Sequence, residues 1–141
     1  MKVVTSEFHV TSKGDADMID ITGYIREAIE EHRFVEGSAT VFVPGATGAV
    51  TTIEFEPGLR EDFPKSFDKI APANAVYKHD ETWHDGNGHS HVRASLLGPS
   101  LTVPFSEARL ILGQWQQIVL LDFDNKPRER RVIVQLIGTG G

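Results

Sequence analysis

Two apolar segments near the end of the chain constrain the fold more than any other feature of the sequence. Residues 115–123 and 129–137 are rich in β-branched and aliphatic side chains. The residues between them, Asp124-Asn125-Lys126-Pro127, are typical of a turn. The pattern predicts two antiparallel strands joined as a hairpin.

The second of these segments is apolar on both faces of the expected strand. Val132, Val134 and Leu136 alternate with Ile133 and Ile137. A strand of this kind is covered twice, once by elements of its own chain and once by a further layer. In so short a chain we expect a partner subunit to supply the second cover, and the alternative is a self-contained sandwich.

The rest of the chain predicts further strands with helices between them. Strands are expected at 2–11, 16–19, 38–43, 50–55 and 100–104, and helices at 22–31 and 58–70. Pro64 is expected to divide or kink the second helix, and Pro104 to place its strand on a sheet edge. These elements predict an α+β fold, a compact domain of mostly antiparallel strands with two or three helices. The domain spans residues 1–141, with a frayed tail at 138–141.

Composition excludes several classes of protein. The chain of 141 residues has no cysteine and a formal net charge of −6. The lack of cysteine excludes thiol nucleophiles and cysteine-based zinc sites, and the acidic balance argues against nucleic acids and anionic membranes as partners. The apolar runs are far shorter than the roughly 20 residues of a membrane-spanning helix, and the first residues do not resemble a secretory signal. We therefore expect a cytoplasmic protein.

Histidines crowd into one short segment. Four of the six in the chain, His79, His84, His89 and His91, lie within thirteen residues that also contain several glycines. Imidazole is the commonest metal ligand among side chains, and a nitrogen-rich site suits zinc, nickel or iron. Asp-Gly-Asn-Gly at 85–88 lacks the alternating acidic positions and closing glutamate of a calcium loop, which excludes that interpretation.

The spacing of these histidines favours two of them as ligands. The residues after Gly88 predict a helix that ends at Gly98. On a helix, His89 and His91 lie about 200° apart and cannot face one ion, whereas Asn87 and His91 share a face. His91 therefore ranks above His89, which remains a candidate if the segment is a strand or loop.

His79 is expected to reach the same ion from the preceding loop. His84, beside Trp83 in an expected turn, is the least certain ligand of the four. The candidate metal ligands are therefore His79, His91 and His89.

The start of the same helix could also bind an anion. Backbone N–H groups at a helix N-terminus attract phosphate, and Asn87, Gly88 and Arg93 are the candidate contacts, with Lys78 nearby. The alternative is an ordinary helix start that Asn87 caps.

Carboxylates supply the remaining candidates. Glu54 and Glu56 alternate with apolar residues and share a strand face, where Glu54 could act as a general base or a metal ligand. Asp85 and Asn87 are further catalytic candidates, because they lie among the histidines. A solvated face is the alternative for the two glutamates.

Arg128, Arg130 and Arg131 fit a solvated turn, with anion binding as the alternative. No serine–histidine–aspartate order, phosphate-binding loop or dinucleotide motif is found.

Several motifs together resemble the YjbQ-like family, of the secondary thiamine-phosphate synthase type. They are Asp20-Ile21-Thr22, the strand pair around 41–55, Tyr77 with His79, Asp85-Gly86-Asn87-Gly88-His89-Ser90-His91, Leu97-Gly98-Pro99-Ser100, Leu112-Gly113-Gln114-Trp115-Gln116 and the closing segment from Arg131 to Gly138. The resemblance covers nearly the whole chain. It implies a homotrimer with a histidine-lined, metal-binding pocket. Among divalent transition metals, zinc is the ion that we expect at these histidines. The implied activity joins a hydroxymethylpyrimidine pyrophosphate to a thiazole phosphate.

The chain departs from that family at two places. Many members have a histidine followed by threonine or serine where this chain has Gly45-Ala46, and many have an Asn-Glu pair within the segment that here reads Thr52 to Pro57. A ligand from the first loop is therefore lost, and Glu54 is the candidate to replace it. These departures indicate a divergent subgroup.

Three functions remain open. The first is an enzyme in which a metal held by His79, His91 and either His89 or Glu54 orients a diphosphate leaving group of a small phosphorylated substrate. The second is a trimeric protein that binds a metal or a small phosphate compound without turnover. The third is a metal-dependent hydrolase, which releases phosphate or pyrophosphate without a coupling partner.

Overall fold

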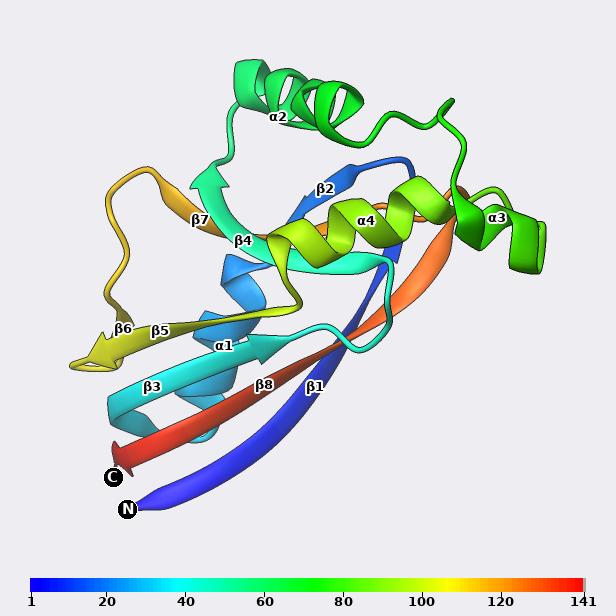
Figure 1. The fold of residues 1–141 in the computed structure, drawn as a ribbon. Coiled ribbons are helices and arrows are strands. Elements are labelled where there is room, and N and C mark those ends of the chain that lie inside the picture. Colours follow the sequence, from blue (N-terminus) through cyan, green and yellow to red (C-terminus); the bar gives the residue numbers. More distant parts are fainter. Residues whose placement is uncertain (141) are drawn as a thin grey trace.

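The computed structural model describes residues 1–140 and contains two antiparallel sheets (Figure 1). The five-stranded sheet has the order β1-β8-β3-β5-β6, and the three-stranded sheet has the order β2-β7-β4. The strands of the first are β1 (Lys2–Ser12), β8 (Arg128–Gly140), β3 (Phe34–Phe42), β5 (Ser100–Ser106) and β6 (Arg109–Leu110). Those of the second are β2 (Asp17–Asp20), β7 (Gln116–Asp122) and β4 (Gly48–Glu54). The α+β class and the antiparallel pairing are as predicted.

The predicted hairpin of the last two strands is wrong. β7 pairs with β2 and β4, whereas β8 pairs with β1 and β3 in the other sheet. Hydrogen bonds explain the crossing, because buried Asp122 and Asp124 at the end of β7 accept hydrogen bonds from Arg130 and Arg128 at the start of β8. These bonds hold the chain where it passes from one sheet to the other.

Four helices, rather than two or three, lie among residues 1–140: α1 (Thr22–Glu31), α2 (Pro57–Ile70), α3 (Lys78–Trp83) and α4 (Gly88–Leu97). α1 has the predicted bounds. α2 is one helix with Pro64 inside it rather than two pieces. Its start is fixed by Glu56, whose carboxylate accepts hydrogen bonds from the backbone of Gly58 and Leu59. That cap and the packing of Phe67 outweigh the single hydrogen bond that a proline removes.

β7 separates two hydrophobic clusters. Ile118 and Leu120 face the cluster that α1 forms with the five-stranded sheet, and Val119 and Leu121 face the cluster beneath α2 and α4. α2 and α4 lie over the three-stranded sheet (Figure 1). β7 is therefore the strand that its own chain covers on both faces.

The other face of β8 is only partly covered. Val132, Val134 and Leu136 are buried, whereas Ile133 is half-buried and Ile137 remains 38% exposed. The side of the five-stranded sheet away from α1 is therefore open in the single chain.

Residues 138–140 are not a frayed tail. Gly138 is paired with Lys2 of β1 and Gly37 of β3, and beyond it β8 continues along β3 to Gly140. A Cβ atom on Gly138 would meet the backbone oxygen of Glu36 at 2.0 Å, which shows how closely the strands approach there. The glycines that suggested disorder are instead required for that approach. Residue 141 lies outside the described residues.

The edge position predicted for Pro104 is confirmed for that part of β5. β5 pairs with β3 along most of its length, and β6 pairs only with Phe105 and Ser106. The missing N–H group of Pro104 therefore falls where no neighbouring strand needs it. Among residues 1–140, no helix is long and apolar enough to cross a bilayer.

Candidate functional site

Three segments enclose a polar pocket of about 340 Å³: the loop after β3, the stretch from α3 to α4, and the connection from β7 to β8. These segments lie at the end of the molecule opposite the two termini (Figure 1). The lining residues of the pocket are Gly45, Ala46, Thr47, His79, Trp83, Asp85, Asn87, His91, Asp124, Arg128 and Arg130. A larger groove of about 770 Å³ lies between α1 and the β5–β6 turn, but no histidine lines it.

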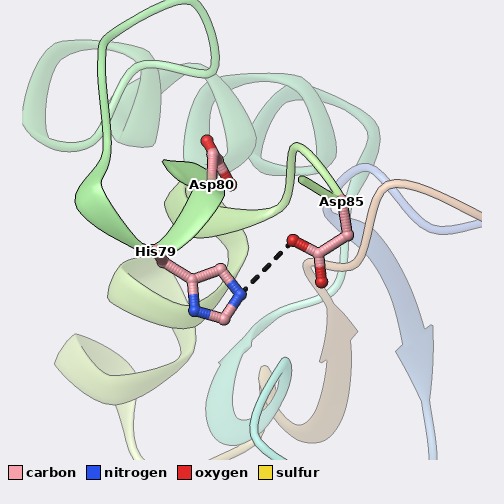
Figure 2. Close-up of side chains that lie close together, drawn as sticks. All are labelled: His79, Asp80 and Asp85. Carbon is pink, nitrogen blue, oxygen red and sulfur yellow. Dashed lines mark ion pairs between the residues drawn. The ribbon is translucent and has the colours of Figure 1, made fainter. Parts of the chain in front are cut away.

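His79 and His91 come together in this pocket, although His79 lies on a helix and not in the loop where it was expected. His79 lies in the first turn of α3 and His91 in the first turn of α4, and their ring centroids are 4.3 Å apart. Asp85 extends from the connection between these helices toward His79, and its Oδ1 lies 3.4 Å from His79 Nε2 (Figure 2).

Asn87 places a third polar atom beside this pair. Its side-chain Oδ1 lies 3.1 Å from His79 Nε2, and this position is 2.9 Å from Asp85 Oδ1. The two side-chain oxygens are both acceptors, whereas His79 Nε2 donates or accepts according to its tautomer. The contact between the oxygens is satisfied in one of two ways: the amide turns so that its nitrogen donates to Asp85 instead of Asp124, or a cation lies between the two oxygens.

The donor set fits a transition metal. An ion held tetrahedrally at about 2.1 Å places neighbouring ligand atoms about 3.4 Å apart, which is the separation of His79 Nε2 and Asp85 Oδ1. One donor atom each from His79, Asp80 and Asp85 also lies within 4.8 Å of the others (Figure 2). Imidazole nitrogen with carboxylate oxygen suits zinc in a protein that has no cysteine. His79, Asp80 and Asp85 are the residues whose ligand atoms lie close enough together to hold such an ion, and the ring of His91 lies beside that of His79.

Asp80 occupies the start of α4, where the sequence predicted an anion site. Its Oδ1 accepts a hydrogen bond of 2.9 Å from the backbone N–H of Gly88 at the start of α4. The N-terminus of this helix is thus already occupied by a carboxylate, and Gly88 does not line the pocket. The side chain of Asn87 makes no capping hydrogen bond.

Arg93, the other predicted phosphate contact, is also elsewhere. It is buried, donates hydrogen bonds to the backbone oxygen of Ala71 and to Asp68, and lies over the ring of Phe67. Arg93 therefore joins α4 to α2.

The structure does not bring His89 to the pocket. Its side chain is buried near Tyr77, with a ring-centroid distance of 6.3 Å. Within residues 1–140 its Nδ1 has no hydrogen-bond partner. Burial lowers the pKa of this imidazole, and the positive charge of Arg93 lowers it further. The cause of the separation is the helical geometry of α4, on which His89 and His91 point in different directions.

Glu54 and His84 also lie outside the pocket lining. Glu54 is exposed at the end of β4, and His84 is the exposed residue that ends α3 in a left-handed conformation. Glu54 therefore does not replace the histidine that the loop at Gly45 lacks. Glu56, which the pattern placed on the same face, is the N-cap of α2.

Behind the pocket lie four charged side chains. Sequence reasoning assigned no role to Asp122 and Asp124, and it favoured a solvated turn over anion binding for Arg128 and Arg130. Asp122 and Asp124 are fully buried, and Arg130 is 6% exposed. Arg130 donates to both oxygens of Asp122, at 2.8 and 2.7 Å, and to the hydroxyl of Thr47. Arg128 donates to Asp124. The only signal in the sequence is the pair of alternating motifs Asp122-x-Asp124 and Arg128-x-Arg130, which resembles an ordinary turn.

Both buried carboxyls are held ionised. Burial alone raises the pKa of Asp122, but hydrogen bonds from Arg130 and Ser12 outweigh it and hold the pKa below its ordinary value. Burial likewise raises the pKa of Asp124, and hydrogen bonds from the Asn125 backbone and from Arg128 and Asn87 bring it below its ordinary value. Asp124 is therefore a fixed negative charge that orients Asn87 from behind, at 3.3 Å.

The fold and the pocket define a class: small α+β proteins with two antiparallel sheets and a histidine–carboxylate pocket at one end. A family model described as "UPF0047 protein YjbQ-like" matches residues 6–139. The chain therefore belongs to the YjbQ-like UPF0047 family.

Individual relatives agree with this assignment. A UPF0047 protein of Archaeoglobus fulgidus is 40% identical over 121 residues, which cover 86% of this chain and 91% of that protein. The UPF0047 protein YugU of Bacillus subtilis is 33% identical, covering 91% of this chain and 94% of the relative.

Solved structures share the whole fold. A YbjQ-like protein of unknown function from Sulfolobus solfataricus P2 matches with a TM-score of 0.91 at 29% identity, covering 98% of this chain and 99% of that one. A yjbq/upf0047 family protein from Clostridium acetobutylicum matches with a TM-score of 0.86 at 35% identity, covering 94% and 99%.

Proposed function

We propose that this protein is a metal-dependent enzyme for small phosphorylated substrates, of the thiamine-phosphate synthase type. Its reaction joins a hydroxymethylpyrimidine pyrophosphate to a thiazole phosphate with loss of diphosphate. The observation that carries the proposal is the convergence of His79, Asp85 and Asn87 on one point of a pocket that His91 also lines. Zinc is the proposed metal, held by His79, Asp85 and His91.

A bound divalent ion would supply positive charge for the departing diphosphate. The protein contributes the orientation of the ligands. Asp124 fixes the amide of Asn87, and Asn87 in turn lies against His79 Nε2, so the imidazole is held in one position before substrate arrives. A substrate that enters the pocket meets a preorganised site.

Trp83 is the proposed contact for a flat heterocycle. It lines the pocket, yet 69% of the residue is exposed, so its ring stands at the mouth of the site. Indole rings stack on aromatic heterocycles with centroids about 4.5–7 Å apart. A pyrimidine or thiazole ring bound there would cover the pocket and exclude water from it.

The test is a coupling assay with purified, zinc-loaded protein and both phosphorylated substrates. We expect His79→Ala and His91→Ala each to lower turnover at least about tenfold. His84→Asn is the matched control, because His84 belongs to the same histidine-rich segment, does not line the pocket, and asparagine tolerates its left-handed backbone. Its turnover should equal that of the wild type.

Three results would overturn the proposal. Unchanged turnover in both pocket variants would refute the site. Release of phosphate or pyrophosphate without the thiazole partner would indicate a hydrolase. Zinc bound by His79 and His91 with no turnover of either substrate would indicate a binding protein.

A further inference from the structure

The loop at Gly45 opens one face of a buried arginine to the pocket. Gly45 has a φ of +110°, which side-chain-bearing residues rarely adopt, and a Cβ atom built on it would lie 3.0 Å from Nη1 of Arg130. Any larger residue at this position would cover that nitrogen. The glycine therefore leaves Nη1 of Arg130 facing the space that the pocket encloses.

The guanidinium groups of Arg130 and Arg128 keep N–H donors that the fold does not use. Arg130 bonds Asp122 and Thr47 through Nε and Nη2, and Arg128 bonds Asp124 through Nε. Within residues 1–140, Nη1 of Arg130 and both Nη nitrogens of Arg128 have no hydrogen-bond partner. A guanidinium presents its donors in a rigid fork that matches the oxygens of phosphate.

We propose that Arg128 and Arg130 form the oxyanion subsite of the pocket and bind a phosphate or diphosphate group through these Nη nitrogens. This assignment rests on the proposed function for its choice of ligand. It moves phosphate recognition away from the start of α4, where Asp80 occupies the helix end and Arg93 is bound to α2. Asp122 and Asp124 hold the two guanidinium groups in place, so binding does not require either side chain to become ordered.

Charge balance determines when an anion can bind. Three carboxylates lie in or directly behind the pocket, Asp85, Asp122 and Asp124, against the two guanidinium groups. The excess negative charge is that of Asp85, the candidate metal ligand. A divalent cation beside Asp85, or removal of its charge, makes the pocket favourable for phosphate.

The test uses inorganic pyrophosphate as the probe and metal-free protein, so that it does not depend on catalysis or on zinc. Asp85→Asn removes the negative charge that a bound cation would otherwise neutralise. Trp115→Phe leaves Trp83, which lines the pocket, as the remaining one of the two tryptophans, and its fluorescence reports binding. We expect pyrophosphate to bind this double variant at least about tenfold more tightly than the Trp115→Phe protein does.

Arg128→Lys and Arg130→Lys, each added to the double variant, should weaken that binding about tenfold. Arg131→Lys is the matched control, since Arg131 pairs with Glu7 on the exposed face of the sheet and should leave the affinity unchanged. Arg128→Lys should disturb the fold less than Arg130→Lys, because 41% of the Arg128 side chain is exposed. Thermal unfolding is measured alongside for all variants.

Equal pyrophosphate affinity in the Arg128→Lys and Arg131→Lys proteins would overturn the assignment, as would no binding to the double variant. The proposed function fails separately, through the coupling assay with zinc-loaded wild-type protein. Pyrophosphate binding that depends on Arg128, in a protein without coupling activity, would keep the subsite and refute the synthase.

Discussion

At the scale of single residues, the buried Asp122–Arg130 pair connects the stability of the fold with the geometry of the pocket. Asp122 is fully buried and accepts two hydrogen bonds from Arg130, whose Nη2 also reaches Thr47. Removing one partner of such a pair leaves an uncompensated charge in the interior. The same interaction that holds Arg130 toward the pocket should therefore dominate the response of the fold to acid.

Asp122→Asn should lower the free energy of unfolding at pH 7 by about 3 kcal/mol. The folded state lowers the pKa of Asp122, so its contribution is full above the unfolded pKa, about 3.9, and is lost as pH falls through the folded pKa. Urea unfolding from pH 7 to 3 should therefore show a shallower acid loss in the variant than in the wild type. Parallel pH profiles for the two proteins would contradict this account.

His89 predicts a second, separate pH effect. Burial lowers its pKa in the folded state, so the folded protein binds fewer protons than the unfolded chain below pH 6.5. Stability due to the neutral imidazole should begin to fall as pH drops through about 6.5. NMR titration of the His89 ring should give a pKa below the ordinary histidine value of about 6.5; a value at or above it would contradict the buried, neutral assignment.

At the scale of elements, the junction of α3 and α4 sets the distance between the two pocket histidines. Gly88 starts α4 against Tyr77, the residue that precedes α3. A Cβ atom on Gly88 would lie 2.4 Å from Cβ of Tyr77. Any side chain at this position must push the two helices apart.

Gly88→Ala should therefore destabilise the protein by about 1–3 kcal/mol and reduce zinc affinity. Gly23→Ala is the matched control, because Gly23 lies in α1 and a Cβ there meets nothing within 4 Å. The control should stabilise the fold by about 0.5–1 kcal/mol and leave zinc affinity unchanged. Calorimetric titration of both variants provides the comparison, and equal zinc affinity in the two would show that the junction does not position the ligands.

Local patterns predicted the elements better than their pairing. The helix over 22–31 follows from an apolar stripe within ten residues, and the structure confirms it. The hairpin prediction was wrong because the bonds between Asp122 and Arg130 depend on where two sheets separate, which no local pattern encodes. Contacts between residues distant in the sequence decide which strands pair, so the turn-like residues between β7 and β8 could not by themselves predict the pairing.

The pocket was predictable to a similar degree. Helical spacing correctly separated His91 from His89, because the angle between side chains on one helix is a local property. For Arg128 and Arg130 the sequence pattern favoured a solvated turn over anion binding, because it does not show that Asp122 and Asp124 hold these side chains at the pocket. Arg93 was assigned to phosphate from its distance along the chain to the helix start, yet the structure buries it against α2.

At the scale of the whole molecule, one face of the five-stranded sheet is left open by the chain's own elements. Val3, opposite Ile137, and Phe42, opposite Ile133, lie on the side away from α1, with exposed fractions of 59% for Val3 and 41% for Phe42. Apolar side chains collected on one face mark interaction surfaces. We propose that copies of this chain cover this face in a homotrimer.

Light scattering coupled to size-exclusion chromatography should then give three times the chain mass of 15.6 kDa. Ile137→Lys should shift the mass toward that of one chain, because it places a charge in the proposed interface. Val76→Lys, at a side chain 88% exposed in the loop before α3, is the control and should remain trimeric. A wild-type protein that elutes as one chain would refute the trimer.

The central claim, a metal site built from His79, Asp85 and His91, is tested most directly by anomalous diffraction at the zinc edge from crystals of zinc-loaded protein. The account predicts one peak in the pocket, at about 2.0–2.2 Å from His79 Nε2 and from oxygen of Asp85, with a ring nitrogen of His91 as a further ligand. A peak at His89 or Glu54, or a pocket without zinc in these crystals, would contradict it.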